Sequence, residues 1–336
     1  MARRKERGRT MNRLDLRLVV VYGGMSSERE ISLRSGVAIC EALKRRGYRN
    51  VLLFDLRRDT LGELLSLGAD LVFLALHGKG GEDGCIQGLL ELAGIPYTGS
   101  SVEASAACMN KIRTKEILSH FGIPTPNFTV LSRRESEDPR EVKDHLLREI
   151  GLPMVLKAPR EGSSIGVRIV YDEGDLTDAL REVFTYDEEL LAEEYMEGKE
   201  LTLPILGNYD PQTLPLVEIT SENDFYDYEA KYTKGMCHHI IPAGIDLETR
   251  KQIEDMGKRA YRALGCHGLA RVDFMLDGRK CPKIIEINTL PGMTEMSLFP
   301  DSARYAGISF EELVDRIVEL ALCKKEKGND REGPSV

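Results

Sequence analysis

The chain has 336 residues, which is long for one hydrophobic core and predicts two or three domains. Its hydrophobic content of 42% and charged content of 30% are typical of a soluble globular protein. The formal net charge of -9 argues against a general nucleic-acid or anionic-membrane binder, although it leaves room for a local basic pocket that holds a nucleotide.

The two ends and the cysteines bear on where the protein works. The basic start, which ends at Arg9, is followed by polar residues rather than an apolar run, so no signal peptide is expected. No apolar run approaches the roughly 20 residues that span a bilayer. Residues 1–13 and 324–336 are predicted to be disordered tails. The seven cysteines are scattered, odd in number and without a C-x-x-C pair, which is typical of reduced thiols in a cytoplasmic protein.

The first third of the chain alternates between strands and helices. Strands are predicted at residues 16–22, 51–54 and 71–76. A capping box, Ser27-x-x-Glu30, is predicted to open a helix after the first strand. The alternation predicts an α/β fold over residues 14–101, with a Rossmann-like, doubly wound parallel sheet. Ligands of such sheets bind at the carboxyl ends of the strands, where Glu28 and His77 would lie.

Beyond residue 101 the pattern changes, and two further domains are predicted. A central subdomain is predicted over residues 102–193, with helices and a strand near 109–121, 139–149 and 153–157. A C-terminal subdomain over residues 194–323 is mostly strands up to Pro215, with helices near 247–264 and 309–323. Within it, the polar segment 221–241 contains several tyrosines, which favours a lid over a bound reactant.

The most informative pair of segments is Arg271-Val272-Asp273 and Glu286-Ile287-Asn288. Each places two polar residues two positions apart in an apolar run, and such residues point to the same face of a strand. If the strands are neighbours, two carboxylates and an amide oxygen converge, and these are hard ligands of the kind that Mg²⁺ prefers. The adjacent arginine indicates an anionic reactant. A structural salt bridge between two strands is the alternative that these residues leave open.

A small loop that we call the Gly/Ser loop, Glu161-Gly162-Ser163-Ser164-Ile165-Gly166, lies between two strand-like runs. Such a loop can bring backbone N–H groups and hydroxyls onto phosphate oxygens, but it lacks the Walker pattern, and a plain hairpin turn is the simpler explanation of the loop alone. Lys157 changes this balance, because a lysine that ends an apolar strand is costly without an anionic partner such as a phosphate. Lys111, on a different element, is a weaker second candidate.

Four other candidates are ambiguous when taken singly. Glu193 and Glu200 could accept hydrogen bonds from an adenine amine or a ribose, but a solvated acidic face explains them equally well. His77 lies where a strand gives way to glycines, yet a lone histidine is usually structural. Glu28 also fits the first turn of a helix, where an acid favours the helix dipole.

Taken together, these segments resemble the D-alanine–D-alanine ligase family of the ATP-grasp superfamily. The motifs that match occur in family order over roughly residues 16–322. They are Gly23-Gly24-x-Ser26-x-Glu28-Arg29-Glu30-Ile31-Ser32, Ala75-Leu76-His77-Gly78-x-Gly80-Gly81-Glu82-Asp83-Gly84, Pro96-Tyr97-Thr98-Gly99-Ser100, Lys157 with Arg160-Glu161-Gly162-Ser163-Ser164-Ile165-Gly166, Tyr226-Asp227-Tyr228-Glu229-Ala230-Lys231-Tyr232, Arg271-Val272-Asp273, and Glu286-Ile287-Asn288-Thr289-Leu290-Pro291-Gly292-Met293-Thr294. Each motif is weak alone, whereas the ordered set is very specific.

The resemblance implies a three-domain ATP-grasp architecture with ATP between the second and third domains. It implies the ATP-dependent ligation of two D-alanines to D-alanyl-D-alanine through an acyl phosphate, with release of ADP and phosphate, for peptidoglycan precursor synthesis. It also implies two Mg²⁺ ions, for which Mn²⁺ can substitute, with Glu286 bridging both ions, Asp273 holding one and Asn288 the other. A homodimer is a further family expectation.

The resemblance also implies roles for individual residues. ATP would contact Lys111, Lys157, Ser163, Ser164 and Lys231, with Glu193 at the adenine and Glu200 at the ribose. Glu28 would hold the ammonium of the first D-alanine near His77, and Ser163 and Tyr232 would link Glu28 to the lid. Arg271 and the backbone N–H of Gly292 would form an oxyanion hole. Lys231 and Ser297 would hold the carboxylate of the second substrate.

Two departures and two alternatives accompany the resemblance. Lys157-Ala158-Pro159 stands where many relatives have Lys-Pro-Ser, and Thr294-Glu295-Met296-Ser297 replaces the commoner Thr-Ser-His-Ser, which leaves the second-substrate contacts open. A variant ligase that forms D-alanyl-D-lactate or D-alanyl-D-serine would share most motifs, although depsipeptide formers usually lack the tyrosine matched by Tyr232. The other alternative is a nucleotide-binding regulator without turnover, against which the complete metal and oxyanion set argues.

Overall fold

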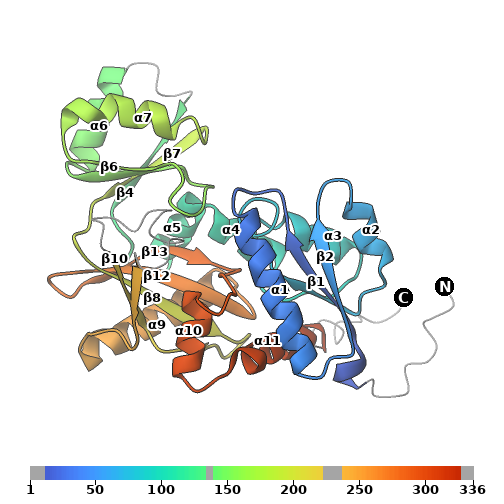
Figure 1. The fold of residues 1–336 in the computed structure, drawn as a ribbon. Coiled ribbons are helices and arrows are strands. Elements are labelled where there is room, and N and C mark those ends of the chain that lie inside the picture. The colour runs from blue at the N-terminus through green and yellow to red at the C-terminus, as the bar shows by residue number, and fades with distance from the viewer. Residues whose placement is uncertain (1–11, 134–138, 222–236, 327–336) are drawn as a thin grey trace, which may run out of the picture.

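A computed structural model describes residues 12–133, 139–221 and 237–326. Within these residues the chain forms three β-sheets with helices packed against them (Figure 1). The N-terminal sheet is parallel, whereas the strands of the central and C-terminal sheets pair in antiparallel fashion. The α/β class and the parallel N-terminal sheet predicted from the sequence are therefore confirmed.

The N-terminal sheet has the strand order β2-β1-β3. Its strands are β1 (Arg17–Gly23), β2 (Asn50–Leu56) and β3 (Leu71–Leu74). The helices that cover it are α1 (Arg29–Arg45), α2 (Leu61–Ser66) and α3 (Cys85–Leu92). Because consecutive residues of a strand point to opposite faces, Leu18 and Val20 pack toward α1 while Val19 and Val21 pack toward α2 and α3. Burial on both faces is what a doubly wound sheet requires.

The central sheet has the strand order β4-β7-β5-β6. Its strands are β4 (Phe128–Ser132), β5 (Met154–Lys157), β6 (Val167–Val170) and β7 (Glu189–Glu194). Figure 1 shows helices α6 (Pro139–Glu149) and α7 (Leu176–Val183) on one face of this sheet, and the 3-10 helix η3 (Glu173–Asp175) precedes α7. Leu146 and Leu180 of these helices join Met154 and Leu190 in a core built from residues 131–192.

The C-terminal sheet has the order β11-β10-β8-β12-β13, with β9 beside β8. Its strands are β8 (Gly198–Leu206), β9 (Gln212–Thr213), β10 (Val217–Ser221), β11 (Cys237–Ile240), β12 (Leu269–Asp277) and β13 (Pro282–Asn288). It packs against α4 (Val102–Met109), α5 (Lys111–His120) and α9 (Leu247–Ala263). Cys108 and Leu118 share a core with Phe274, so α4 and α5 pack on this sheet rather than on the central one. The three-domain division by sequence stays a prediction.

The last two helices return the chain to the N-terminal sheet. They are α10 (Leu298–Tyr305) and α11 (Phe310–Glu326), and Figure 1 shows α11 beside the end of α1. Phe299 and Val314 belong to the same core as Leu18 and Phe73. The N-terminal and C-terminal regions are therefore joined by a common core, whereas the central region has a core of its own.

The predicted tails extend too far into the chain at both ends. Arg13 lies in a short 3-10 helix, η1 (Arg13–Asp15), and its guanidinium pairs with Asp315 of α11 at 3.1 Å. Helix α11 likewise continues to Glu326, inside the predicted C-terminal tail. Residues 1–11 and 327–336 lie outside the described residues.

The capping box predicted at Ser27 is wrong. Helix α1 begins at Arg29, with Glu28 at the N-cap position and no side-chain hydrogen bond from that cap. Ser26 makes the local contacts instead, because its hydroxyl donates to the carbonyl of His77 at 2.7 Å and accepts from the N–H of Glu28 at 3.2 Å. The carboxylate of Glu28 can therefore point away from the helix.

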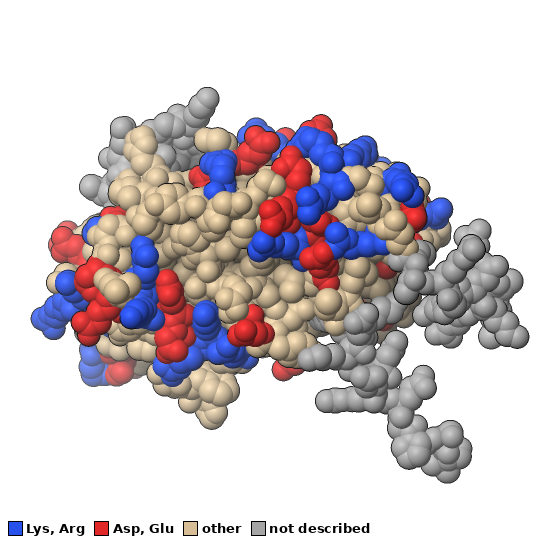
Figure 2. Space-filling view, turned by 90° about the horizontal axis from the view of Figure 1, so that it is seen from below, with Lys and Arg blue, Asp and Glu red and all other residues tan. Residues whose placement is uncertain are grey.

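The surface carries both signs of charge. Figure 2 shows acidic and basic side chains interspersed on one face, with no single extended basic area there. Among the described residues, no helix has the length and apolar character of a membrane span. The thiols of Cys40, Cys85, Cys108, Cys266, Cys281 and Cys323 are free, and Cys108 and Cys266 lie with their Sγ atoms 3.7 Å apart.

Candidate active site

The polar residues of β12 and β13 lie side by side, as the sequence predicts. In this antiparallel pair Arg271 faces Asn288, and Asp273 faces Glu286. Residues directly opposite each other in such a pair project to the same face of the sheet. Asp273 is buried and accepts a hydrogen bond from the hydroxyl of Thr202 on the neighbouring β8. The four residues predicted to converge therefore do so.

Each carboxylate of this patch has a cationic partner. Arg271 holds Asp273 through Nε to Oδ1 at 2.9 Å and Nη2 to Oδ2 at 2.8 Å. Lys111 places Nζ 3.3 Å from Oε2 of Glu286 and donates to the carbonyl of Glu161 at 2.6 Å. The alternative that the sequence left open is a salt bridge between two strands. The salt bridge of Arg271 with Asp273 lies within one strand, β12. An arginine and a metal ion can each pair with a carboxylate. The contact of Arg271 with Asp273 is therefore compatible both with a structural salt bridge and with a metal site.

The donor set for a metal relies on an amide. Among the described residues, no group of three or more His, Cys, Asp or Glu side chains could hold a metal ion. A magnesium site at β12 and β13 therefore needs the side-chain oxygen of Asn288 in addition to the two carboxylates. That oxygen accepts a hydrogen bond from the N–H of Leu290 at 3.0 Å, which fixes its orientation.

Gly292 and Ser297 lie close together after β13. A Cβ built on Gly292 would be 3.0 Å from Oγ of Ser297, which is tighter than ordinary van der Waals contact. The Ser297 hydroxyl also accepts from the N–H of Thr294 at 3.1 Å. The N–H of Met293, the residue after Gly292, donates to Oγ of Ser35 on α1 at 3.3 Å. This contact anchors the turn on the N-terminal region.

Glu28 reaches from the N-terminal domain to the Gly/Ser loop. Its carboxylate accepts a hydrogen bond from the hydroxyl of Ser163, although the two residues are 135 positions apart. Ser163 and Ser164 have φ angles of 50° and 62°, in the left-handed region that few side chains adopt. Gly162 permits the approach, since a Cβ there would lie 3.1 Å from Oε2 of Glu28. The loop does connect an antiparallel pair, β5 and β6, but its backbone also presents Ser163 to Glu28.

His77 is buried between α1 and the turn after β13. Its Nδ1 lies 3.0 Å from the carbonyl oxygen of Leu290, and its Nε2 lies 3.3 Å from Oγ of Ser35. Burial lowers the pKa of His77, and the nearby negative charge of Glu28 opposes that shift. The imidazole is therefore neutral at pH 7.

Glu82, in the Gly-rich loop after β3, is buried beside the same site. Its carboxylate accepts the N–H of Gly78 at 2.5 Å. Burial, together with the negative charge of Glu28, raises the pKa of Glu82 to about 8. A carboxyl that is neutral at pH 7 avoids a second negative charge next to Glu28.

A second charged cluster lies in the central region, at Glu193 of β7. Nζ of Lys157 on β5 is 2.8 Å from one carboxylate oxygen, and Nζ of Lys115 on α5 is 3.1 Å from the other. Glu193 is 2% exposed and Lys115 is completely buried. The solvated acidic face considered for Glu193 is wrong. The structure also supplies a protein anion for Lys157, so the cost of its burial does not by itself require a phosphate.

Burial and pairing act against each other in this cluster. Burial lowers the pKa of Lys115 to about 8, although Glu193 partly offsets the shift. Burial opposes ionisation of Glu193 and Lys157 as well, but the pairing outweighs it, so the pKa of Glu193 is lowered and that of Lys157 is raised. Oε1 of Glu193 is buried without a hydrogen-bond partner among the described residues, despite its ion-pair contact. It therefore has a lone pair to offer a donor.

The remaining predicted residues are only partly placed. Glu200 lies on β8, opposite Met275 of β12, and its charge contributes to the raised pKa of Lys157. Lys231 and Tyr232, with most of the predicted lid, lie outside the described residues.

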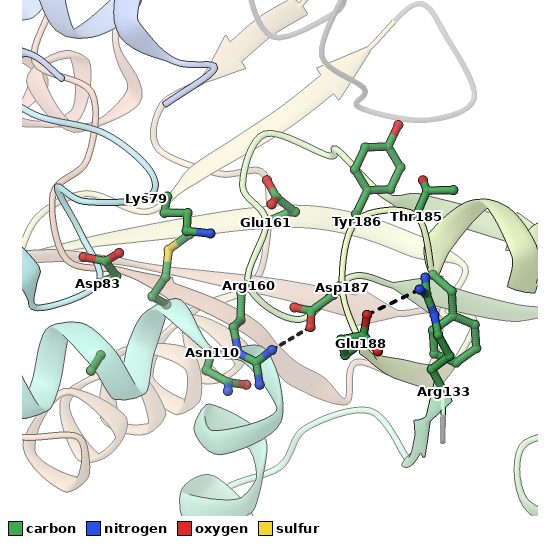
Figure 3. Close-up of a pocket in the computed structure, with 13 residues that line it drawn as sticks. Lys79, Asp83, Asn110, Arg133, Arg160, Glu161, Thr185, Tyr186, Asp187 and Glu188 are labelled. Carbon is green, nitrogen blue, oxygen red and sulfur yellow. Dashed lines mark hydrogen bonds and ion pairs between the residues drawn. The ribbon is translucent and has the colours of Figure 1, made fainter. Parts of the chain in front are cut away.

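A cavity of about 420 Å³ lies at the start of the Gly/Ser loop, where Glu161 lines it. Figure 3 shows Arg160 directed at Asp187 and Arg133 at Glu188 along its wall, and the two pairs are 2.6 Å and 3.3 Å apart. None of the predicted site residues that the structure describes lines it. The chemistry-bearing groups converge elsewhere, so we place the candidate site at β12, β13 and the Glu28 contact.

Comparison with known proteins decides the family. The model described as D-ala D-ala ligase C-terminus matches residues 117–319, and the model described as D-ala D-ala ligase N-terminus matches residues 57–100. The chain belongs to the D-alanine–D-alanine ligase family. The D-alanine–D-alanine ligase of Carboxydothermus hydrogenoformans is 49% identical to it over 313 residues, which cover 93% of this chain and 100% of that relative.

Solved structures of D-alanine–D-alanine ligases and of a related enzyme share the fold. The D-alanine–D-alanine ligase of Bacillus anthracis complexed with ATP superposes with a TM-score of 0.80 at 36% identity, covering 94% of this chain and 99% of that chain. The VanG D-Ala:D-Ser ligase of Enterococcus faecalis has a TM-score of 0.80 at 29% identity, covering 91% and 99%. The fold of this family member is therefore ATP-grasp, as the resemblance implied.

Two residues near the family site were missed as candidates by sequence reasoning. Lys115 follows Lys111 by four residues on α5, and residues four apart share one side of a helix. That spacing was the available signal, but it does not reveal burial. Glu82 lies in the motif of residues 75–84, and the glycines beside it gave no reason to expect a buried acid.

Proposed function

We propose that this protein is an ATP-dependent D-alanine–D-alanine ligase. The carboxylate of the first D-alanine attacks the γ-phosphate of ATP, which gives an acyl phosphate and ADP. The amine of the second D-alanine then attacks the acyl carbonyl and expels phosphate. The observation that carries the proposal is the register of β12 and β13, which pairs Arg271 with Asn288 and Asp273 with Glu286 in a member of this family.

ATP is proposed to bind where the central and C-terminal sheets meet. Phosphoryl transfer between anions depends on positioning and charge neutralisation, which Lys111 and Lys157 can supply at the phosphates together with Ser163 and Ser164 of the Gly/Ser loop. Oε1 of Glu193 is buried and contacts Nζ of Lys115 at 3.1 Å, and its remaining lone pair suits the amine of an adenine, because buried acceptors are nearly always paired. Glu200, near Lys157, is proposed to hold the ribose.

Two magnesium ions, or manganese in their place, are proposed at Asp273, Glu286 and Asn288. The donor set fits, because it consists only of hard oxygen atoms. Bound there, the ions would neutralise charge on the phosphates of ATP. Arg271 contacts both oxygens of Asp273, so a metal ion bound to Asp273 would compete with it, and a guanidinium displaced in this way would be available to the oxyanion of the acyl-transfer step.

The amino-acid substrates are proposed to lie between Glu28 and the turn after β13. Glu28 would hold the ammonium of the first D-alanine, with neutral His77 beside it. The backbone N–H of Gly292 would join Arg271 in the oxyanion hole. Ser297, which lies against Gly292, would hold the carboxylate of the second D-alanine with Lys231. Tyr232 would link Glu28 and Ser163 to the lid.

A variant ligase is the second candidate. The similarity to the VanG D-Ala:D-Ser ligase extends over nearly the whole chain, so the fold does not separate the two activities. A regulator that binds nucleotide without turnover is a weaker alternative, since it would have no need for paired Arg271 and Asp273 next to Glu286. We also infer a homodimer in the cytoplasm from the family resemblance.

The test is phosphate release from ATP and Mg²⁺ with and without D-alanine, together with the mass of the product. Release that depends on D-alanine and yields D-alanyl-D-alanine supports the proposal. Release only after D-serine or D-lactate is added moves the assignment to a variant ligase. ATP binding without release under any of these conditions favours the regulator.

A further inference from the structure

Lys115 is the most completely buried ammonium in the described part of the chain, and the proposed chemistry does not use it. It has no exposed side-chain surface. Its Nζ donates to Oγ1 of Thr125 at 2.7 Å and to the carbonyl of Pro126 at 3.4 Å, and it lies 3.1 Å from Oε1 of Glu193. Removing an ammonium from water costs free energy, which the three partners of Lys115 must offset. A side chain held at this cost is a candidate for a role in the site.

The charge balance of the cluster gives the first argument. Lys115 and Lys157 both pair directly with the carboxylate of Glu193, so the direct ion pairs alone leave one positive charge in excess, and the more distant carboxylates of Glu194, Glu200 and Glu286 offset it in part. If Lys115 were absent, Lys157 and Glu193 would form a neutral pair, and a phosphate would have to compete with Glu193 for the ammonium of Lys157. Attraction between charges is strong where water is excluded, so this competition would weaken phosphate binding.

The location of the cluster gives the second argument. Thr125, which accepts from Lys115, donates in turn to the carbonyl of Ile284 at 2.8 Å. Ile284 lies on β13, two positions before Glu286. Lys115 therefore connects Glu193 on the central sheet with the strand that carries a proposed metal ligand. Two other lysines also link these halves: Lys111 contacts the carbonyl of Glu161 and Glu286 of β13, and Lys283 of β13 pairs with Glu194 of β7. Lys115 differs from them in being completely buried.

We propose that Lys115 is a positioning residue for ATP, which compensates Glu193 so that Lys157 is available to the phosphates and which ties β7 to β13. The inference rests on the proposed function only in that Lys157 contacts the phosphates of ATP and Glu193 its adenine. Lys115 itself touches neither. It acts through Glu193 and Thr125.

The test separates phosphate affinity from adenine affinity. Purified Lys115→Met, Glu193→Gln and the double variant are titrated with ATP and with inorganic tripolyphosphate, both with Mg²⁺ and without D-alanine. Lys115→Met is expected to weaken both ligands by about 10-fold to 100-fold, as loss of an orienting partner does around metal ligands. Glu193→Gln is expected to weaken ATP but not tripolyphosphate. The double variant is expected to recover tripolyphosphate binding, because Lys157 then has no competing carboxylate.

Arg113→Met is the matched control, since Arg113 is exposed on the same helix and pairs with Glu116 at 2.6 Å. It should bind both ligands as the unaltered protein does. A folded Lys115→Met with unchanged tripolyphosphate and ATP affinities overturns the inference, and so does a double variant that binds tripolyphosphate no better than Lys115→Met. If Lys115→Met does not fold, Glu193→Gln still tests the competition, because weaker tripolyphosphate binding by Glu193→Gln than by the unaltered protein would also overturn the inference. Unaltered protein that binds ATP yet forms no ADP with D-alanine would instead refute the proposed function.

Discussion

The two charged clusters of this protein differ in composition, and the difference matches the charges that they are proposed to bind. At β12 and β13, two carboxylates, Asp273 and Glu286, are balanced by Arg271 and Lys111. At β7, the single carboxylate of Glu193 is outnumbered by Lys115 and Lys157. The first cluster can exchange its cations for metal ions, and the second can accept an anion. A site for a metal–nucleotide complex needs both.

The clusters also differ in how far their charges are exposed. The side chains of Glu286 and Arg271 are 31% and 16% exposed, whereas that of Glu193 is 2% exposed. Of the side chains that would exchange partners, Glu286 and Arg271 are within reach of solvent, whereas Asp273 is only 6% exposed. Side chains that hold the charge balance fixed are enclosed. The predictions below test whether this division is real.

The largest expected effect is the loss of Arg271. Arg271→Ala removes both the partner of Asp273 and a proposed oxyanion donor, so turnover in the D-alanine-dependent phosphate assay should fall by about 10²–10³. Arg279→Ala, at an exposed position in the turn after β12, should retain full activity. Near-normal turnover in Arg271→Ala would remove this cluster from the catalytic site.

Loss of a carboxylate from the same cluster should act on the metal. Asp273→Asn is expected to raise the Mg²⁺ concentration for half-maximal activity by about 10-fold to 100-fold, because one hard anionic ligand becomes neutral. Asp255→Asn, exposed on α9, is the matched control. A Mg²⁺ dependence that is unchanged in Asp273→Asn would favour the purely structural salt bridge with Arg271.

The cluster of Lys115, Lys157 and Glu193 is expected to make the free energy of unfolding depend on pH. Burial lowers the pKa of Lys115 from 10.5 to about 8, within reach of the charges of Glu193, Lys157 and Glu194. Between these two pH values the unfolded chain binds a proton at Lys115 that the folded protein does not. The free energy of unfolding should therefore rise with pH relative to Lys115→Met, by on the order of 2 kcal/mol. Urea unfolding of both proteins at about pH 7 and about pH 10 measures this, and a constant difference would contradict it.

The smallest effect is expected at the contact between the Gly/Ser loop and Glu28. Ser163→Ala removes the hydroxyl that donates to Glu28, and hydrogen bonds to a charged group are worth enough to lower kcat/KM for D-alanine by about tenfold. Ser66→Ala, exposed at the end of α2, should have no effect. An unchanged kcat/KM would mean that Glu28 needs no support from this loop.

Much of the architecture was predictable because it depends on local periodicity. Alternation of strands and helices predicts the doubly wound N-terminal sheet, and the spacing of Arg271 and Asp273 predicts that both share a face, as β12 shows. The ordered motifs predict the family. The capping box at Ser27 failed because its spacing describes an isolated helix, whereas Ser26 instead bonds His77, a residue of another strand end.

What the sequence by itself determined is the order of the elements and the partners that lie two residues apart on one strand. Only the tertiary structure decided that Ser163 meets Glu28, that α4 and α5 pack on the C-terminal sheet, and that Lys115 is buried against Glu193. Those contacts join residues that are distant along the chain. A repeat of two or 3.6 residues fixes which way a side chain points from its own element, but which distant element it meets is set by how whole sheets and helices pack.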